Sequence, residues 1–130
     1  MKFIATKKAP HAIGPYSQAV VANGMIYTSG QIALNAEDQM SQGDVSEQTH
    51  QVMKNLEHVL QAAGAEYADV IKTTIFLANM DDFATVNEIY EKYFGEHKPA
   101  RSTVAVKTLP KNALVEIDCI ALSKTRANFG

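Results

Sequence analysis

The chain has 130 residues, 46% of them hydrophobic, which is enough for one packed core and too short for two, so residues 1–130 are expected to form a single domain. Its formal net charge of −2 leaves no basic surplus to neutralise phosphates, and its apolar runs are too short to cross a bilayer, so neither nucleic acid nor a membrane is an indicated partner. The single cysteine and a start without a long apolar stretch are what we expect of a protein in the reducing cytoplasm.

The first 43 residues are predicted to form short strands and loops. The clearest signal is Asn23-Gly24, a dipeptide that tolerates positive φ at both positions of a tight turn and therefore joins two strands into a hairpin. Proline and glycine residues between positions 10 and 15 interrupt regular structure before it. The expected strands are 2–5, 19–22, 25–29 and 31–34, and a polar surface loop is expected over 35–43.

Two amphipathic helices are predicted from apolar residues that recur with helical spacing. The first is capped by Asp44 and stopped by Gly64, and the second is capped by Asp81 or Asp82 and stopped by Gly95. The apolar stripe of the first helix is Val45, Val52, Leu56, Val59, Leu60 and Ala63, with Gln48, Gln51, Lys54, Glu57 and Gln61 placed off it. The apolar face of the second helix is Phe83, Val86, Ile89, Tyr90, Tyr93 and Phe94.

Three further strands are expected over 70–78, 102–107 and 114–123. The first of them is rich in β-branched residues and too apolar on both faces for a sheet edge, so it is predicted to be central. The order of elements indicates an α+β fold with both helices on one sheet face. The other face has apolar content that so short a chain cannot cover, and self-association is therefore predicted.

The first candidate site residues lie in two loops around the predicted hairpin. Gly14-Pro15-Tyr16-Ser17-Gln18 precedes the hairpin, and Ser29-Gly30-Gln31 follows it. Glycine, proline and serine serve turns for conformational reasons alone, which is the simpler interpretation. In the functional interpretation, Gly30 lets the backbone approach a ligand while Tyr16 and Ser29 offer hydroxyl groups.

The second candidate is Arg101, in the run Arg101-Ser102-Thr103 at the start of a predicted strand. A lone arginine is usually a solvated surface charge, but the start of an interior strand is an unusual place for one. With neighbouring donors, Arg101 is suited to hold a small carboxylate through two parallel charge-assisted hydrogen bonds, each typically worth about 1.5–3 kcal/mol. Lysine lacks that planar fork.

The third candidate is Glu116, which strand alternation places with Asp118 on a face otherwise made of Leu114, Ile120 and Leu122. Either this acid forms a structural ion pair with Arg101, or it borders a pocket where a carboxylate is held for acid/base work. If the last two strands pair as a hairpin, Arg101 lies roughly 13 Å along the sheet from the level of Glu116. That offset favours a cleft shared between two chains.

Other features of the sequence do not indicate a site. The four histidines, His11, His50, His58 and His97, lack metal-ligand spacing. Cys119 alternates with apolar residues as a core residue does, and there is no glycine-rich phosphate loop. We therefore expect neither a metal nor a cofactor.

A series of short motifs runs through the chain: Ile13-Gly14-Pro15-Tyr16-Ser17-Gln18-Ala19, Ser29-Gly30-Gln31-Ile32, Val86-Asn87-Glu88-Ile89-Tyr90, Arg101-Ser102-Thr103-Val104, Leu109-Pro110 and Val115-Glu116-Ile117. In order and spacing they resemble the Rid (YjgF) family, particularly its RidA subgroup. The similarity spans essentially the whole chain, and the ordered set is far more specific than any single motif.

The resemblance implies a fold of the bacillary chorismate-mutase type: a six-stranded mixed sheet with two helices on one face, in a homotrimer with a central barrel and clefts between subunits. It also implies a cofactor-independent deaminase that hydrolyses 2-aminoacrylate, 2-iminopropanoate and 2-iminobutanoate to 2-ketoacids and ammonia. By resemblance, Arg101 binds the substrate carboxylate and Glu116 deprotonates the attacking water. The residues implied to line the cleft are Tyr16, Ser29, Gly30 and Asn87.

Position 103 departs from the family pattern, because threonine stands where many RidA proteins have cysteine. The hydroxyl of Thr103 can still donate a hydrogen bond to a carboxylate, so we expect activity with a changed substrate preference. The rival interpretation is a noncatalytic trimer that binds small carboxylates and regulates a partner in response to metabolites. Ribonuclease activity has been ascribed to the family, but the acidic charge and the lack of a histidine pair give it little support here.

Overall fold

The computed structural model describes residues 1–124, and within them the chain forms six strands and two α-helices. The strands are β1 (Lys2–Ile4), β2 (Ala19–Ala22), β3 (Met25–Thr28), β4 (Val70–Leu77), β5 (Ala100–Ala105) and β6 (Val115–Leu122). The helices are α1 (Val45–Ala62) and α2 (Phe83–Phe94), and the 3-10 turns are η1 (Tyr67–Asp69), η2 (Met80–Asp82) and η3 (Pro110–Asn112). No helix in this part of the chain is long and apolar enough to cross a membrane.

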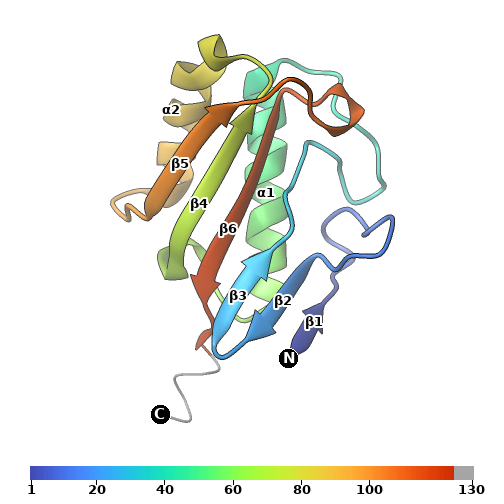
Figure 1. Ribbon diagram of the computed structural model, residues 1–130, viewed down its shortest axis with the longest axis vertical. Helices are drawn as coiled ribbons and strands as arrows, with labels where there is room; N and C mark the ends of the chain where they lie inside the picture. The colour runs from blue at the N-terminus through green and yellow to red at the C-terminus, as the bar shows by residue number, and fades with distance from the viewer. Residues whose placement is uncertain (125–130) are drawn as a thin grey trace.

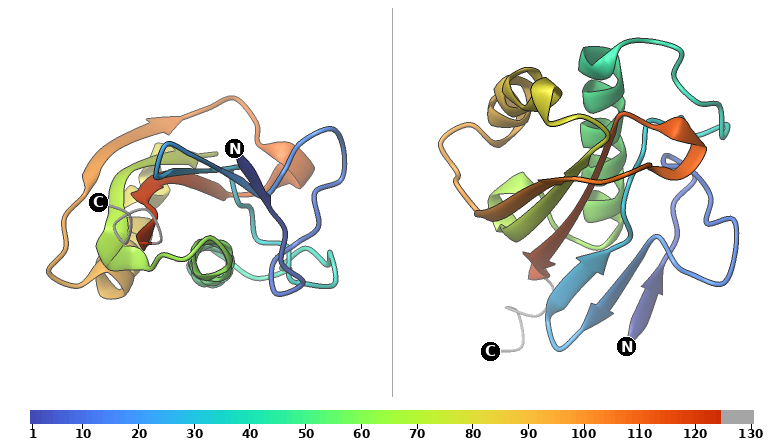
Figure 2. Two further views of the ribbon diagram at one scale, coloured as in Figure 1. Left: turned by 90° about the horizontal axis from the view of Figure 1, so that it is seen from below. Right: turned by 45° about the horizontal axis from the view of Figure 1, so that its top comes forward.

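All six strands form one mixed sheet in the order β1-β2-β3-β6-β4-β5 (Figure 1). Every neighbouring pair is antiparallel except β4 and β5, which are parallel and are connected through α2. Both helices lie on the same side of the sheet, as the view from below shows (Figure 2). The predicted α+β architecture, with a six-stranded sheet and helices on one face, is therefore confirmed.

The hairpin between β2 and β3 is confirmed, and its turn has the conformation that the dipeptide favours. Asn23 has φ 52° and Gly24 has φ 75°, so both central residues are in the left-handed region. A two-residue turn of this kind matches the right-handed twist of the strands it joins. The strand expected over 31–34 is wrong: this segment makes only the isolated bridges of Gln31 with Ile117 and of Leu34 with Met40.

The helix boundaries follow the sequence signals, except at the start of α2. The side chain of Asp44 accepts a hydrogen bond from the backbone N–H of Glu47 at 3.0 Å, as expected of an N-cap. The predicted cap at Asp81 or Asp82 is wrong, because Asp82 makes no side-chain capping bond. Instead the side chain of Asn79 accepts from the N–H of Asp81 and caps η2, which leads directly into α2.

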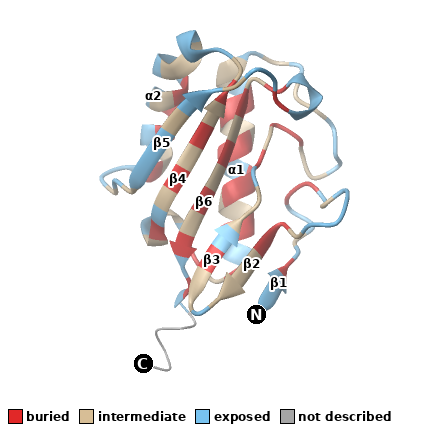
Figure 3. Ribbon diagram, in the orientation of Figure 1, coloured by how far each residue is buried: buried red, intermediate tan, exposed pale blue. Residues whose placement is uncertain are grey.

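The core lies between the helices and one face of the sheet. In β6 the residues Val115, Ile117, Cys119 and Ala121 are buried, and the residues between them are not (Figure 3). This strict alternation confirms the predicted faces of the last strand. Burial of each large aliphatic side chain in this layer contributes about 1.5–3 kcal/mol relative to exposure.

The opposite face of the sheet, called the open face below, carries apolar side chains in a row across the strands. Phe3 is aligned with Val20, Val20 with Tyr27, and Tyr27 with Ile120. Phe3 is 67% exposed and Tyr27 47% exposed. A row of exposed and half-buried apolar groups across four strands is typical of a surface that contacts another chain.

The last two strands do not pair as a hairpin, because β4 lies between them. β5 pairs with β4 in parallel and β6 pairs with β4 antiparallel. Parallel neighbours need a crossover connection, and α2 supplies it on the helix-covered face. The distance along the sheet inferred from a hairpin therefore does not apply, and the relation of Arg101 to Glu116 follows from the register of each with β4.

Candidate functional site

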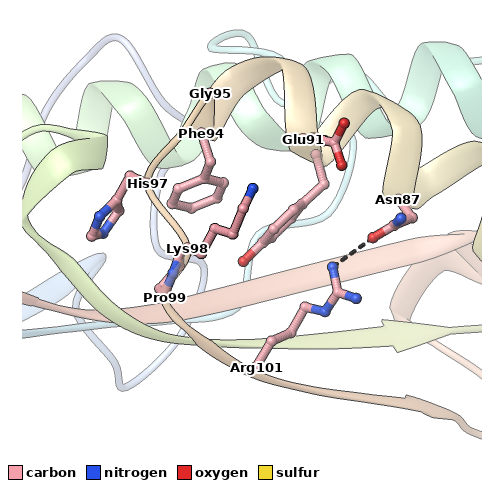
Figure 4. A pocket seen from close by; sticks show the side chains of 9 residues that line it. Asn87, Glu91, Phe94, Gly95, His97, Lys98, Pro99 and Arg101 are labelled. Carbon is pink, nitrogen blue, oxygen red and sulfur yellow. Dashed lines mark hydrogen bonds between the residues drawn. The ribbon is translucent and has the colours of Figure 1, made fainter.

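Arg101 lies on the edge strand β5, on the side of the sheet that carries the helices. Its partner on the neighbouring strand β4 is Thr73, whose side chain is buried toward the helices. From there the guanidinium reaches α2, where its Nη1 donates a hydrogen bond to Oδ1 of Asn87 at 2.6 Å (Figure 4). The structure thus brings together two residues that the sequence had placed in the site.

Two aromatic rings of α2 flank the guanidinium. Its Cζ lies 5.4 Å from the ring centroid of Phe83 and 5.1 Å from that of Tyr90. Cation–π contacts of this kind contribute about 0.5–1 kcal/mol at exposed sites, and here they restrict the orientation of a long side chain. The hydroxyl of Tyr90 is itself hydrogen-bonded to Oγ1 of Thr73 at 2.7 Å, so its ring is fixed.

Arg101 borders a cavity of about 470 Å³, called the Arg101 cavity below, between α2 and the segment that leads into β5. Figure 4 shows the side chains of Phe94, His97 and Lys98 around it. The exposed guanidinium is already oriented by Asn87, and its remaining N–H groups can donate to a small carboxylate. This half of the site can therefore anchor an acid.

Glu116 lies on β6 and belongs to the open face, because its neighbour across β4 is Phe76 rather than a core residue. It borders a second cavity of about 330 Å³, called the Glu116 cavity below. Tyr16 of the N-terminal loop and Gly30 after β3 line the same cavity, together with Pro110 of η3. Three further predicted site residues, Tyr16, Gly30 and Glu116, are thus brought together.

Gly30 leaves room for the carboxyl group of Glu116. A Cβ atom at position 30 would lie 2.5 Å from Oε2 of Glu116 and 2.8 Å from its Cδ, so only glycine permits this approach. Burial raises the pKa of Glu116 above its ordinary value, and the charge of Asp118 raises it further. Once ionised, such a carboxylate is a stronger base than an exposed one.

Buried amide side chains hold the walls of the Glu116 cavity. Gln18 accepts from the N–H of Thr6 at 2.6 Å and donates to the carbonyl oxygens of Thr6 and Pro10, which fixes the N-terminal loop. Asn55 of α1 donates to the carbonyl oxygens of Ile32 and Leu34. Asn55 thus binds these carbonyls from the helix, and the N–H of Leu34 turns back to the carbonyl oxygen of Ile32 at 2.8 Å, so the segment does not continue as a strand.

The hydroxyl groups of Ser29 and Thr103, both predicted to contact a ligand, have different surroundings within the chain. The hydroxyl of Ser29 donates to the carbonyl oxygen of Ser17 at 2.5 Å, so it ties the loop that carries Tyr16 to the end of β3. Thr103 lies on the same face of β5 as Arg101, and its Oγ1 is buried with no hydrogen-bond partner among the described residues. A buried hydroxyl without a partner is uncommon and is suited to receive a ligand group.

Within one chain the anchor and the acid do not meet. Arg101 points to the helix-covered face and Glu116 to the open face, and the two cavities have no lining residue in common. The interpretation of the pair as an ion pair within the chain is therefore wrong. It also follows that burial, and not a neighbouring guanidinium, dominates the pKa of Glu116 in the single chain.

Several residues that shape the site were not found from the sequence. Phe83 and Tyr90 were assigned to the core, although with Asn87 they have the spacing of one helix stripe that also faces Arg101. Gln48 and Asn55 are 5% and 0% exposed. Both lie three or four residues from apolar residues of α1, and this spacing could have shown that the two amide side chains are buried.

Comparison with known proteins gives a consistent family. The family model described as Endoribonuclease L-PSP matches residues 6–123. A human protein named 2-iminobutanoate/2-iminopropanoate deaminase is 47% identical over 122 residues, which are 93% of this chain and 89% of that protein. A Lactococcus lactis protein named as a candidate regulator, AldR, is 51% identical over 126 residues, which are 96% of this chain and 100% of that protein.

Solved structures agree with the sequence comparison. The crystal structure of Escherichia coli TdcF with bound serine matches with a TM-score of 0.90 at 41% identity, covering 95% of this chain and 100% of that one. The ordered motifs, the sheet with its two helices and the extent of these matches lead to one conclusion: the chain belongs to the Rid (YjgF) family, whose model is described as Endoribonuclease L-PSP.

Proposed function

We propose that this protein is a cofactor-independent deaminase that hydrolyses 2-aminoacrylate, 2-iminopropanoate and 2-iminobutanoate to 2-ketoacids and ammonia. The human relative is named for two of these imines. The observation that carries the proposal is the pair of prepared half-sites: a guanidinium oriented by Asn87 at one cavity and a carboxyl group seated against Gly30 at the other. The first suits a small carboxylate and the second suits a water molecule.

The chemistry needs little beyond placement, because a protonated imine carbon is already electrophilic. Arg101 holds the substrate carboxylate, and ionised Glu116 takes a proton from water as the water oxygen bonds to the imine carbon. The resulting carboxylic acid returns that proton to the nitrogen. Glu116 then accepts the hydroxyl proton as the C–N bond breaks and passes it to the departing ammonia, so that the products are the 2-ketoacid and ammonium and Glu116 is ionised again.

The two half-sites are on opposite faces of one sheet, so we propose that each complete site is shared between two copies of the chain. Arg101 comes from one copy and Glu116 from its neighbour. The exposed apolar row on the open face supports assembly, since it includes Phe3 and Tyr27. We propose the homotrimer with a central barrel, of the bacillary chorismate-mutase type, as the assembly that buries it.

We place the reaction in the cytoplasm. Cys119 is the chain's single cysteine, and it is buried and unpaired. Burial raises the pKa of its thiol to about 12, so it is not a thiolate at neutral pH. A chain without disulfides suits a reducing compartment, and a reaction that needs no thiol is not affected by this unreactive one.

A mixing experiment tests both the activity and the shared site. Release of ammonia and 2-ketoacid from freshly generated imines is measured for the wild type, for Arg101→Ala, for Glu116→Gln and for the two variants refolded together. Each variant alone should lose about 10²–10⁴-fold in rate. In a cyclic trimer assembled at random, about one quarter of the sites combine intact Arg101 with intact Glu116, so about one quarter of wild-type activity should return.

Two results of this experiment would contradict the proposal. If mixed trimers form but remain as inactive as either variant alone, the site is not shared. If the wild type releases no more ammonia than Arg101→Ala does, the protein is not an imine deaminase.

The second candidate function is a metabolite-responsive regulator that binds small carboxylates without turnover. The relative named AldR favours it, because that name describes a regulator. Binding of pyruvate, measured by calorimetry, separates the two functions when it is compared with turnover. An enzyme binds pyruvate in the Glu116→Gln variant but loses turnover there, whereas a regulator binds pyruvate and hydrolyses no imine even as the wild type.

A further inference from the structure

The segment between β5 and β6 is held in an unfavourable backbone conformation beside Glu116. Lys111 has φ 56° and Asn112 has φ 55°, so two successive residues with side chains lie in the left-handed region. Asparagine tolerates this region, but a lysine occupies it only when its surroundings impose it. Pro110 and Lys111 line the Glu116 cavity, and Glu116 follows the segment by only a few residues.

A side chain of α1 fixes the end of this segment. Oε1 of Gln48 accepts a hydrogen bond from the backbone N–H of Leu114 at 2.9 Å, across 66 positions of the sequence. On its other side, the carbonyl oxygen of Leu114 accepts from the N–H of Ala78 at 3.1 Å. Leu114 is thus held from both sides, immediately before β6 begins at Val115.

The side chain of Gln48 is suited to hold Leu114 in place. It is 5% exposed, so its amide oxygen is largely shielded from water although Gln48 and Leu114 border one surface cavity. The ladder with β4 sets the register of β6, and the hydrogen bond to Leu114 fixes the end of the strand from which Glu116, two residues later, reaches toward Gly30. Because the carboxyl group of Glu116 fits closely against Gly30, a small shift of the strand changes this contact.

We propose that Gln48 is a positioning residue for Glu116: by holding Leu114, it keeps the strained 110–112 turn in place and seats the Glu116 carboxyl group against Gly30. The consequence for catalysis rests on the proposed function. Loss of the Gln48 acceptor lets the turn relax and lets the carboxyl group swing into solvent. The substrate anchor at Arg101 is on another face and keeps its place.

The test compares two buried side chains of α1. Gln48→Met keeps length and volume but removes the acceptor. The matched control is Thr49→Val, since the hydroxyl of Thr49 is buried and, among residues 1–124, bonds only within the helix, to the carbonyl oxygen of Val45 at 2.7 Å. Gln48→Met should lower kcat about 10- to 100-fold, as expected for a displaced catalytic group, while KM changes less than threefold. Thr49→Val should leave both values near those of the wild type.

A second measurement does not depend on activity. The Glu116 carboxyl group is titrated by carbon-13 NMR in the wild type and in both variants. Its pKa should be the same in the wild type and in Thr49→Val, and should shift in Gln48→Met, where the carboxyl group loses the burial that raises its pKa. An unchanged Glu116 titration in Gln48→Met, or a kcat within twofold of the wild type, would overturn the proposal.

The outcomes also separate this proposal from the proposed function. If no variant hydrolyses imines, the wild type included, the proposed function fails, and the Glu116 titration still decides whether Gln48 positions that group. If Gln48→Met does not fold, amide hydrogen exchange of the wild type decides. The Leu114 N–H should then be strongly protected, and exchange as fast as that of the exposed loops would contradict the restraint.

Discussion

The carboxyl group of Glu116 lies against Gly30, so a side chain at position 30 would displace it. In Gly30→Ala the new Cβ would lie 2.5 Å from Oε2 of Glu116, and ordinary contact begins at 3.4 Å. The carboxyl group must therefore move by roughly 0.9 Å, a displacement that can cost a catalytic group about 100-fold in rate. Gly30 does not have a positive φ, so alanine adds no backbone strain, and the flexible glutamate can move at little cost in stability.

The expected result is a kcat reduced about 10- to 100-fold with the free energy of unfolding changed by less than about 1 kcal/mol. Imine hydrolysis and urea denaturation measure the two quantities. Gly43→Ala is the control for kcat, because its Cβ would lie 1.8 Å from Oε2 and 2.8 Å from Cβ of the exposed Glu47, which is a more severe collision but lies away from both cavities of the site. A Gly30→Ala enzyme that is stable and retains kcat within twofold would refute the placement of Glu116 as the base.

Two further predictions concern the anchor and the pH dependence. Arg101→Lys should raise KM about 10- to 100-fold with a smaller change in kcat, because lysine cannot donate to Asn87 and to both carboxylate oxygens from one plane. Steady-state kinetics measures both values, and an unchanged KM would argue against carboxylate binding by Arg101. The pH profile of kcat/KM should fall as the pH drops through the pKa of Glu116, since the base must be ionised; burial raises this pKa, and the facing Arg101 of the neighbouring copy lowers it. Removal of the facing cation in Arg101→Ala should move this acid limb to higher pH, and a limb that moves lower would contradict a shared cleft.

The parts of the fold that could be predicted are those set by neighbouring residues. Asn23-Gly24 specified its hairpin because both residues accept positive φ, and Asp44 specified the start of α1 because its side chain reaches the N–H of Glu47. The faces of β6 followed from alternation alone. In each case the residues that determine the structure lie within a few positions of one another, so a short stretch of sequence is enough to predict it.

The errors share a different cause, since each depends on contacts between residues far apart in sequence. Whether β5 pairs with β6 or with β4 is decided by the crossover through α2, which no local pattern records. Residues 31–34 have the composition of a strand, but Asn55 of α1 takes up two of their carbonyl groups. The motifs identified Arg101 and Glu116 correctly as residues that border cavities, whereas their opposite faces became evident only from the register of each with β4.

The description of the family model as an endoribonuclease raises the question of whether this chain could cleave RNA. Cleavage by acid/base chemistry commonly relies on a pair of histidines near a basic surface, and the net charge here is −2. Three of the four histidines are engaged elsewhere: His50 with the hydroxyl of Tyr93, and His58 and His97 with backbone carbonyl groups. The fourth, His11, is paired with Asp38 at the rim of the Glu116 cavity. A small carboxylate held by one guanidinium therefore fits the charge and geometry of this chain better than a polyanion does.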